Sequence, residues 1–390
     1  MESIKTMFKN NLRQYAMLIA LVFIMALFQI LTKGILLVPM NVTNLILQNA
    51  YVFILAIGMT LCILTGGNID LSVGSVVAFI GALCGNFIIT MHMNLSVSLL
   101  FALFIGLMIG AWQGFWIAYV RIPAFIVTLA GQLLFRGLTL FMLKGLTLGP
   151  FPDRFQLISS GFVPDVLGAP KGSLNGSTMI VGVILAAIYI VSQIGRRSSH
   201  RRNGFDVTSF AAFIAQIALV AAAILVITIW LARYKGLPII FIIIGILILG
   251  YSFFTMRTVP GRYLYAMGGN EKAAQLSGIN TNKVLFLAYV NMGVLAAVAG
   301  IAFTSRLNAA SPQSGQNFEL DAIAACFIGG ASAYGGVGTI IGAIIGALVM
   351  GVLNNGMSIL GMGSDVQQIV KGLVLLIAVA FDVISKKKAR

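Results

Sequence analysis

The segment GRYLYAMGGNEKAAQLSGINTNK, residues 261–283, is a polar island between two long apolar runs. It carries four charged residues, and charged side chains are costly in hydrocarbon, so the segment is predicted to lie outside a membrane. Glu271–Leu276 contains good helix formers and is followed by Gly278, while Gly268-Gly269 predicts a turn before it. A short helix on a basic loop suits a docking surface for a soluble partner.

The composition on either side of this island is that of an integral membrane protein. Of the 390 residues, 59% are hydrophobic and only 9% are charged, whereas soluble domains have about 25% charged residues. Several charge-free runs, such as 93–120 and 207–232, reach the roughly 20 residues that cross a bilayer. We therefore expect an all-α polytopic membrane protein of about 10–12 transmembrane helices, forming a single domain over residues 1–390.

The apolar segments and their connections define an expected topology. The longest connection, residues 144–177, is predicted to be an external loop with a short helix around Phe155–Ser160. Two further connections, 195–208 and 256–283, which contains the polar island, are predicted to be cytoplasmic, and glycine-broken helices are expected near 66–75 and 329–338. The expected spans are 16–37, 44–64, 71–90, 96–119, 124–143, 178–195, 209–232, 237–255, 284–304, a short or broken helix after 322, 339–358 and 366–384.

The distribution of basic residues predicts the orientation. The net charge is +15, and with both termini in the cytoplasm most Lys and Arg residues fall in the inner loops. This is the positive-inside bias of a cytoplasmic (inner) membrane protein. Binding of nucleic acid is excluded as an explanation of the charge, because no basic helix or aromatic-interleaved basic patch is present.

The sequence lacks the residues that metal binding, ATP binding and catalysis would need. Cys62, Cys84 and Cys326 all fall in apolar runs, which indicates packing, and no Cys/His cluster with metal-ligand spacing occurs. The chain has no GxxxxGK[ST] motif, so it cannot bind ATP through a P-loop. No catalytic set is visible either, so the chain is not expected to be an enzyme or to bind a cofactor. If the chain takes part in an energy-driven process, the energy must come from another subunit or from an ion gradient.

The sequence GGNIDLSVGS, residues 66–75, predicts an unwound stretch followed by polar side chains. Unwound backbone at membrane depth survives only against protein or along a water-filled path. Asp70 has two interpretations, an N-cap of the next span or a contact in the transport pathway. One hypothesis makes the glycines of 329–338 the equivalent element of an internal repeat. The pathway candidates here are Asn68, Asp70, Ser72 and Ser75.

Polar residues inside other spans are further candidates. Thr128, Gln132 and Arg136 lie at i, i+4 and i+8 on one helical face. They are either polar contacts within the helix bundle, with an arginine that snorkels, or a stripe beside the pathway. Asn354 and Asn355 follow a stripe of small residues, which is typical of close helix packing, and they are also pathway candidates.

The polar island resembles the coupling loop of ABC importer permeases. Ala273-Ala274-Gln275-Leu276-Ser277-Gly278 is similar to the Ala-Ala-x-x-x-Gly core of their EAA motif, although Glu271 stands one residue further from the alanine pair than is usual. GGNIDLSVGS, PAFIVTLAGQ (123–132) and FELDAIAACFIGGASAYGGVGT (318–339) resemble the ribose/xylose/arabinose branch of these branched-chain-permease-like proteins. The chain length is most like that of the long xylose or multiple-monosaccharide members.

The resemblance implies a permease subunit of an ATP-driven ABC importer that moves a monosaccharide, a pentose or hexose such as xylose, arabinose, galactose or ribose, by alternating access. It implies three partners besides membrane lipid: an ABC ATPase with two nucleotide-binding domains that hydrolyses ATP with Mg, a periplasmic or lipid-anchored sugar-binding protein, and a second permease in a homodimer or heterodimer. The implied ATPase-coupling residues are Gly261, Arg262, Gly268, Gly269, Asn270, Glu271, Ala273, Ala274, Leu276 and Gly278.

Two alternatives stay open at this point. An ion-coupled secondary sugar transporter would need an intramembrane carboxylate cluster, and no acidic residues are paired in this way in the sequence. Permeases of the same family for autoinducer-2 or nucleosides share the motifs quoted above.

Overall fold

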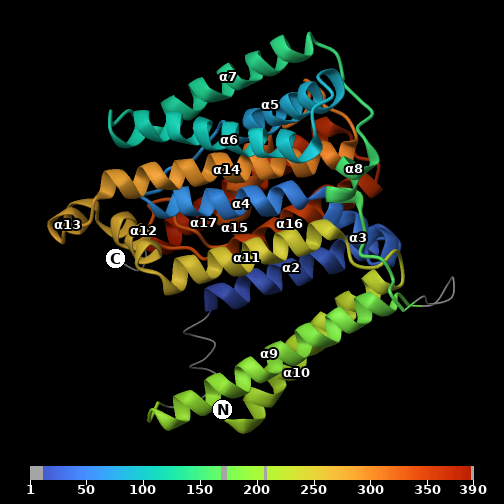
Figure 1. Ribbon diagram of the computed structural model, residues 1–390. Coiled ribbons are helices and arrows are strands. Elements are labelled where there is room, and N and C mark those ends of the chain that lie inside the picture. The colour runs from blue at the N-terminus through green and yellow to red at the C-terminus, as the bar shows by residue number, and fades with distance from the viewer. Residues whose placement is uncertain (1–11, 168–173, 206–208, 388–390) are drawn as a thin grey trace.

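The computed structural model describes residues 12–167, 174–205 and 209–387, and every regular element in them is a helix. Figure 1 shows these helices running roughly parallel to one another in a thick bundle. The helices are α2 (Leu12–Leu31), α3 (Pro39–Gln48), α4 (Ala50–Leu64), α5 (Val73–Gly85) with the π-helical turn η1 (Asn86–Thr90), α6 (Leu95–Ala118), α7 (Ala124–Leu143), α8 (Asp153–Ser160), α9 (Gly176–Arg202), α10 (Phe210–Ala232), α11 (Ile239–Arg257), α12 (Val259–Gly269), α13 (Glu271–Leu276), α14 (Thr281–Leu307), α15 (Phe318–Ile328), α16 (Ile340–Ile359) and α17 (Ser364–Lys387).

The predicted all-α membrane architecture is confirmed. Within the described ranges, nine helices are long and apolar enough to cross a membrane, or ten if α3 and α4 count as one bent span. Two other predicted spans correspond to shorter helices, α2 with an apolar stretch at 17–31 and α15 with 11 residues. The helix predicted within the external loop is present as α8.

Helix α4 forms the centre of the bundle, next to α14 (Figure 1). All of its residues from Ala50 to Leu64 are buried, as expected of a helix that is apolar all round. Helix α14 approaches α6 closely, because the glycine at position 106 of α6 leaves room for Ala297 and for the backbone at Gly293. Close contact of small residues is a common way for helices to pack in lipid.

The predicted second span, 44–64, is bent by 44° between α3 and α4. Asn49 lies at the bend with a non-helical ψ of 12°, and its Nδ2 donates to the carbonyl oxygen of Leu45 at 2.8 Å. This side-chain hydrogen bond competes with the backbone ladder at the bend.

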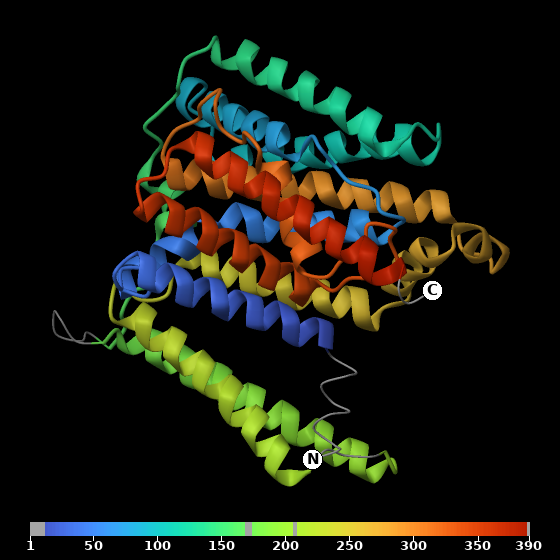
Figure 2. The same ribbon diagram turned by 180° about the vertical axis from the view of Figure 1, so that it is seen from behind.

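The helices α9 and α10 form an outlying hairpin. Figures 1 and 2 show it lying apart from the remaining bundle, with α13, the C-terminal end of α17 and the α9–α10 turn toward the same end of the molecule. The basic segment 195–208 was predicted to be a loop. Its first part is instead the end of α9, which continues to Arg202 because the cap residue Asn203 and then Gly204, with φ +74°, end the helix.

Candidate functional site

The coupling loop is built from two short helices. Thr258 Oγ1 accepts a hydrogen bond from the N–H of Gly261 at 3.2 Å and caps α12. Asn270 Oδ1 accepts one from the N–H of Ala273 at 3.0 Å and caps α13. These side chains satisfy N–H groups that a helix start leaves without partners.

The short helix predicted at Glu271–Leu276 is confirmed as α13, and it ends before Gly278, whose φ is +84°. The turn predicted at Gly268-Gly269 is wrong. Both glycines are the last residues of α12, and the chain bends at Asn270, which has extended backbone angles. The cap at Asn270 starts a new helix there, and so it fixes the position of the bend.

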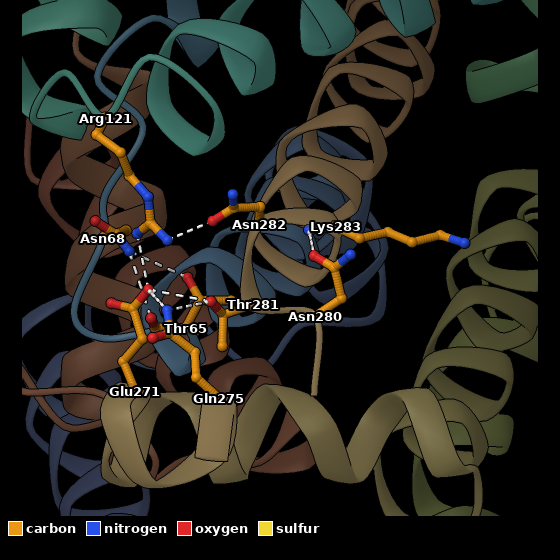
Figure 3. Close-up of polar contacts among 9 residues, drawn as sticks. All are labelled: Thr65, Asn68, Arg121, Glu271, Gln275, Asn280, Thr281, Asn282 and Lys283. Atoms are coloured by element: carbon orange, nitrogen blue, oxygen red, sulfur yellow. Dashed lines mark hydrogen bonds and ion pairs between the residues drawn. The ribbon is translucent and has the colours of Figure 1, made fainter. Parts of the chain in front are cut away.

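An ion pair joins α13 to the turn between α6 and α7. Arg121 Nη1 lies 2.7 Å from Glu271 Oε1, and Arg121 also donates to Asn282 (Figure 3). Glu271 Oε1 additionally accepts from Thr281 Oγ1 at 3.3 Å, and Gln275 Nε2 donates to Thr281 Oγ1 at 2.9 Å. One carboxylate thus connects α13 to the start of α14 and to the α6–α7 turn.

The outer surface of this loop is accessible. Leu276 is 91% exposed, and Arg262, Gly269, Asn270, Ala273 and Gly278 are also exposed, whereas Gly261 and Ala274 are buried and Gly268 and Glu271 are intermediate. Leu276 is thus an apolar side chain that lies almost fully accessible on a capped helix among polar neighbours. The predicted coupling residues therefore divide into a buried support and an exposed surface.

Helix α12 is anchored to the two glycine-rich breaks. A Cβ at Gly268 would lie 1.9 Å from the carbonyl oxygen of Leu64, so α12 approaches the end of α4 closely. Tyr265 donates its hydroxyl to the carbonyl oxygen of Gly338 at 2.9 Å, and burial raises the pKa of Tyr265. A movement of α12 would consequently disturb the non-helical segments at both 65–72 and 329–338.

The break predicted near 66–75 is confirmed over residues 65–72, which are not helical. Asp70 is not the N-cap of α5, so the capping interpretation is wrong. The N-cap residue is Ser72, and no side chain makes a capping hydrogen bond to the first turn of α5. Asp70 is buried, and its Oδ1 accepts from the N–H and the hydroxyl of Ser72 at 2.8 and 2.6 Å. Asn68 donates to Thr65 Oγ1 at 3.2 Å.

Ser72 connects this break to α6, since Gln113 Nε2 donates to its hydroxyl at 2.6 Å. Ser75 is also buried, and its hydroxyl has no hydrogen-bond partner among the described residues. Gln113 was missed in the sequence analysis. The available signal was a lone glutamine inside the apolar run 93–120.

A second unwound segment, residues 308–317, leads from the C-terminal end of α14 to α15. It meets the first at α5, because a Cβ at Gly74 would lie 2.2 Å from the carbonyl oxygen of Gly315 and 2.5 Å from Glu319 Oε2. Only glycines allow this approach. The N-terminal ends of α5 and α15 therefore lie close together.

The two unwound segments follow helices that run in opposite directions relative to the coupling loop. Helix α4 ends at the coupling loop and is followed by 65–72 and α5, whereas α14 begins there and is followed by 308–317 and α15. The repeat hypothesis named 329–338 as the counterpart of 66–75. The segment 329–338 is non-helical, as predicted, and packs against the first break, with the N–H of Gly336 donating to the carbonyl oxygen of Leu64 at 3.1 Å; the repeat hypothesis stays a prediction.

The three residues of the predicted polar face of α7 have different partners. Thr128 is fully buried and donates to the carbonyl oxygen of Ala124 in its own helix at 2.9 Å. Gln132 Nε2 donates to Glu319 Oε1 at 3.1 Å, and Arg136 Nη1 donates to the carbonyl oxygens of Pro312 and Ser314 at 2.9 and 2.7 Å. Gln132 and Arg136 thus hold the second unwound segment against α7.

Asn354 and Asn355 lie elsewhere. Asn355 exchanges hydrogen bonds with Asn41 at 2.8 and 3.1 Å and donates to Gln48 at 3.3 Å, linking α16 to α3. The small-residue stripe before it is occupied within the chain, since Gly346 contacts the backbone of Ala325 in α15. The structure does not bring these asparagines to the meeting point of α5 and α15.

A buried ion pair was not foreseen from the sequence. Lys371 Nζ lies 3.0 Å from Asp321 Oδ1, and Tyr51 donates to Asp321 Oδ2 at 2.8 Å. The pair joins α15 to α17, while Tyr51 adds α4. In the part of the chain that the structure describes, no group of three or more His, Cys, Asp or Glu residues could hold a metal ion.

Comparisons with known proteins agree with this architecture. Residues 41–379 match a family described as branched-chain amino acid transport system / permease component. The chain is 39% identical to the xylose transport system permease protein XylH of Haemophilus influenzae, over 97% of this chain and 98% of that protein. It is 38% identical to XylH of Escherichia coli K12 over 97% and 94%, and 35% identical to the E. coli K12 ribose import permease protein RbsC over 96% and 95%. No solved structure matches.

Proposed function

This chain belongs to the branched-chain amino acid transport system / permease component family, and from that premise we propose that it carries an aldopentose, with xylose as the first candidate, into the cytoplasm. It is a permease subunit of an ABC monosaccharide importer, a non-catalytic transmembrane component that binds no cofactor itself. The chain matches the xylose and ribose permeases over similar lengths, and its higher identity to the two xylose permeases, 39% and 38% against 35%, supports the choice of xylose over ribose.

The family implies an ABC ATPase and a sugar-binding protein as partners. We propose that the ATPase docks on the exposed face of α13 around Leu276, with Ala273 and Gln275 beside it. The observation that carries this proposal is the support behind that face: Arg121, Thr281 and Gln275 fix Glu271, and α12 contacts both glycine-rich breaks. Force applied to α13 would pass through packed elements to the unwound segments.

The chain is proposed to lie in the inner membrane, with α13 and both termini on the cytoplasmic side. The external loop with α8 then faces the sugar-binding protein, periplasmic or lipid-anchored. A second permease chain, identical or homologous, completes the path. Support comes from the basic residues of α9 and of the α6–α7 turn, which share one end of the bundle with α13.

A co-purification experiment tests the proposal. The tagged chain is isolated from its own membranes as wild type, as Leu276→Asp and, as a control at a lipid-facing position, as Leu249→Ala, which alters an exposed side chain of α11. We expect an ATP-hydrolysing protein to co-purify with wild type and Leu249→Ala and to be lost with Leu276→Asp.

Reconstitution of the chain alone addresses the ion-coupled alternative. A permease subunit should move no xylose in liposomes without its ATPase, whatever ion gradient is imposed. Accumulation of xylose driven by Na⁺ or H⁺ in the purified chain would contradict the proposed function.

A further inference from the structure

The segment 308–317 exposes polar side chains on the outside of the bundle. Gln313 and Gln316 are exposed and hydrogen-bonded to each other at 2.6 Å. Gln132 and Arg136 of α7 are half-buried beside the same segment and contact it or Glu319. Gln132, Arg136, Gln313 and Gln316, with Glu319 buried behind them at 5% exposure, form a surface that we term the polar wall.

The polar wall lies near the middle of the membrane. Arg136 is twelve residues into α7 from Ala124, which corresponds to about 18 Å along the helix axis. The 11 residues of α15 separate Phe318 by about 16 Å from the break at 329–338, which contacts α4 at the coupling end. Both measures reach about half of a hydrocarbon thickness of about 30 Å.

Lipid cannot cover such a surface without cost. Unwound backbone and amide side chains at this depth are tolerated where they are buried in protein or line water. Exposed large apolar side chains such as Leu129 and Leu133 surround the wall on α7 and suit lipid or a partner helix. The wall therefore indicates an aqueous path that this chain borders on one side.

The chemistry of the wall fits a neutral polyhydroxyl ligand. Amide groups donate and accept hydrogen bonds, as sugar hydroxyls do, and a carboxylate accepts them. Glu319 has a neutral donor, Gln132, on one oxygen, and Arg136 is engaged by backbone carbonyls of Pro312 and Ser314. The N-terminal ends of α5 and α15 add oriented N–H dipoles at the same place, as in discontinuous transporter helices.

We propose that the polar wall is the mid-membrane sugar-contact site of the importer, with Gln132, Gln313 and Gln316 as the residues that meet the sugar, Glu319 buried behind Gln132 to orient its amide, and the same face of a second permease chain as the opposite side. This inference rests on the proposed function, because it takes the transported sugar from it.

Cysteine accessibility tests the wall in the assembled importer. The three native cysteines are buried, so the wild-type protein provides the background. Gln316→Cys and Gln313→Cys are compared with Leu133→Cys, a depth-matched position on α7 that is 72% exposed. Liposomes containing the importer and its partners receive ATP and a membrane-impermeant methanethiosulfonate reagent, with or without D-xylose.

We expect Gln316→Cys to react at least tenfold faster than Leu133→Cys and to be protected at least twofold by D-xylose but not by sucrose. If Gln316→Cys and Gln313→Cys are both as unreactive as Leu133→Cys, or if xylose leaves their rates unchanged, the inference is wrong. Xylose uptake and ATPase co-purification by the wild-type protein report on the proposed function separately, so the two failures are distinguishable.

Discussion

Arg121 and Glu271, which are 150 residues apart in the sequence, form an ion pair of 2.7 Å that fixes α13 to the α6–α7 turn. Both side chains are partly exposed, with 43% and 39% of their surfaces accessible. Exposed pairs of this kind stabilise a fold by about 0.2–1 kcal/mol. The pair therefore positions α13 more than it stabilises the protein.

A charge exchange tests this positioning role. Glu271→Arg places two arginines together and should reduce xylose uptake at least fivefold while lowering stability by less than about 1 kcal/mol. The double variant Arg121→Glu/Glu271→Arg restores the attraction and should recover much of the uptake. Uptake in liposomes and thermal unfolding in detergent are the measurements, and a double variant as inactive as the single one would contradict a pairwise role.

Gly268→Ala is expected to destabilise the permease by about 1–3 kcal/mol, because its Cβ would meet the Leu64 carbonyl oxygen at 1.9 Å. Gly269→Ala is the matched control, since nothing lies within 4 Å of its Cβ position. Thermal unfolding of the isolated permease should show a lower Tm for the first variant only. Equal Tm values for the two variants would mean that α12 is free to shift.

The buried pair of Lys371 and Asp321 predicts a strong asymmetry between single and double variants. Lys371→Met leaves a buried carboxylate without its cation and should cost about 3–5 kcal/mol. Lys371→Met/Asp321→Asn removes both charges and should recover most of that loss, with Tyr51 still able to donate to the new amide. Chemical denaturation monitored by fluorescence measures both, and additive effects would argue against the pair.

The orientation can be read from single cysteines. Leu276→Cys and Val166→Cys are exposed at positions on α13 and in the external loop, and Cys62, Cys84 and Cys326 are buried. In sealed right-side-out vesicles an impermeant maleimide should label Val166→Cys and leave Leu276→Cys unlabelled until the membrane is opened. The reverse pattern would invert the proposed topology and place α13 outside.

The sequence by itself determined the class of the protein and its membrane segments, since hydrophobic length and the position of charges act locally along the chain. It also located α13 and the break at 65–72, because Asn, Gly and Pro specify caps and turns through their own backbone preferences.

Only the tertiary structure decided which polar groups meet. The pairings of Arg121 with Glu271, of Gln132 with Glu319 and of Lys371 with Asp321 join residues from different helices. Sequence spacing carries no information on such partners, because buried polar groups find each other through helix packing. The packing also placed 329–338 against the first break and brought the starts of α5 and α15 together through the close approach of Gly74 and Gly315.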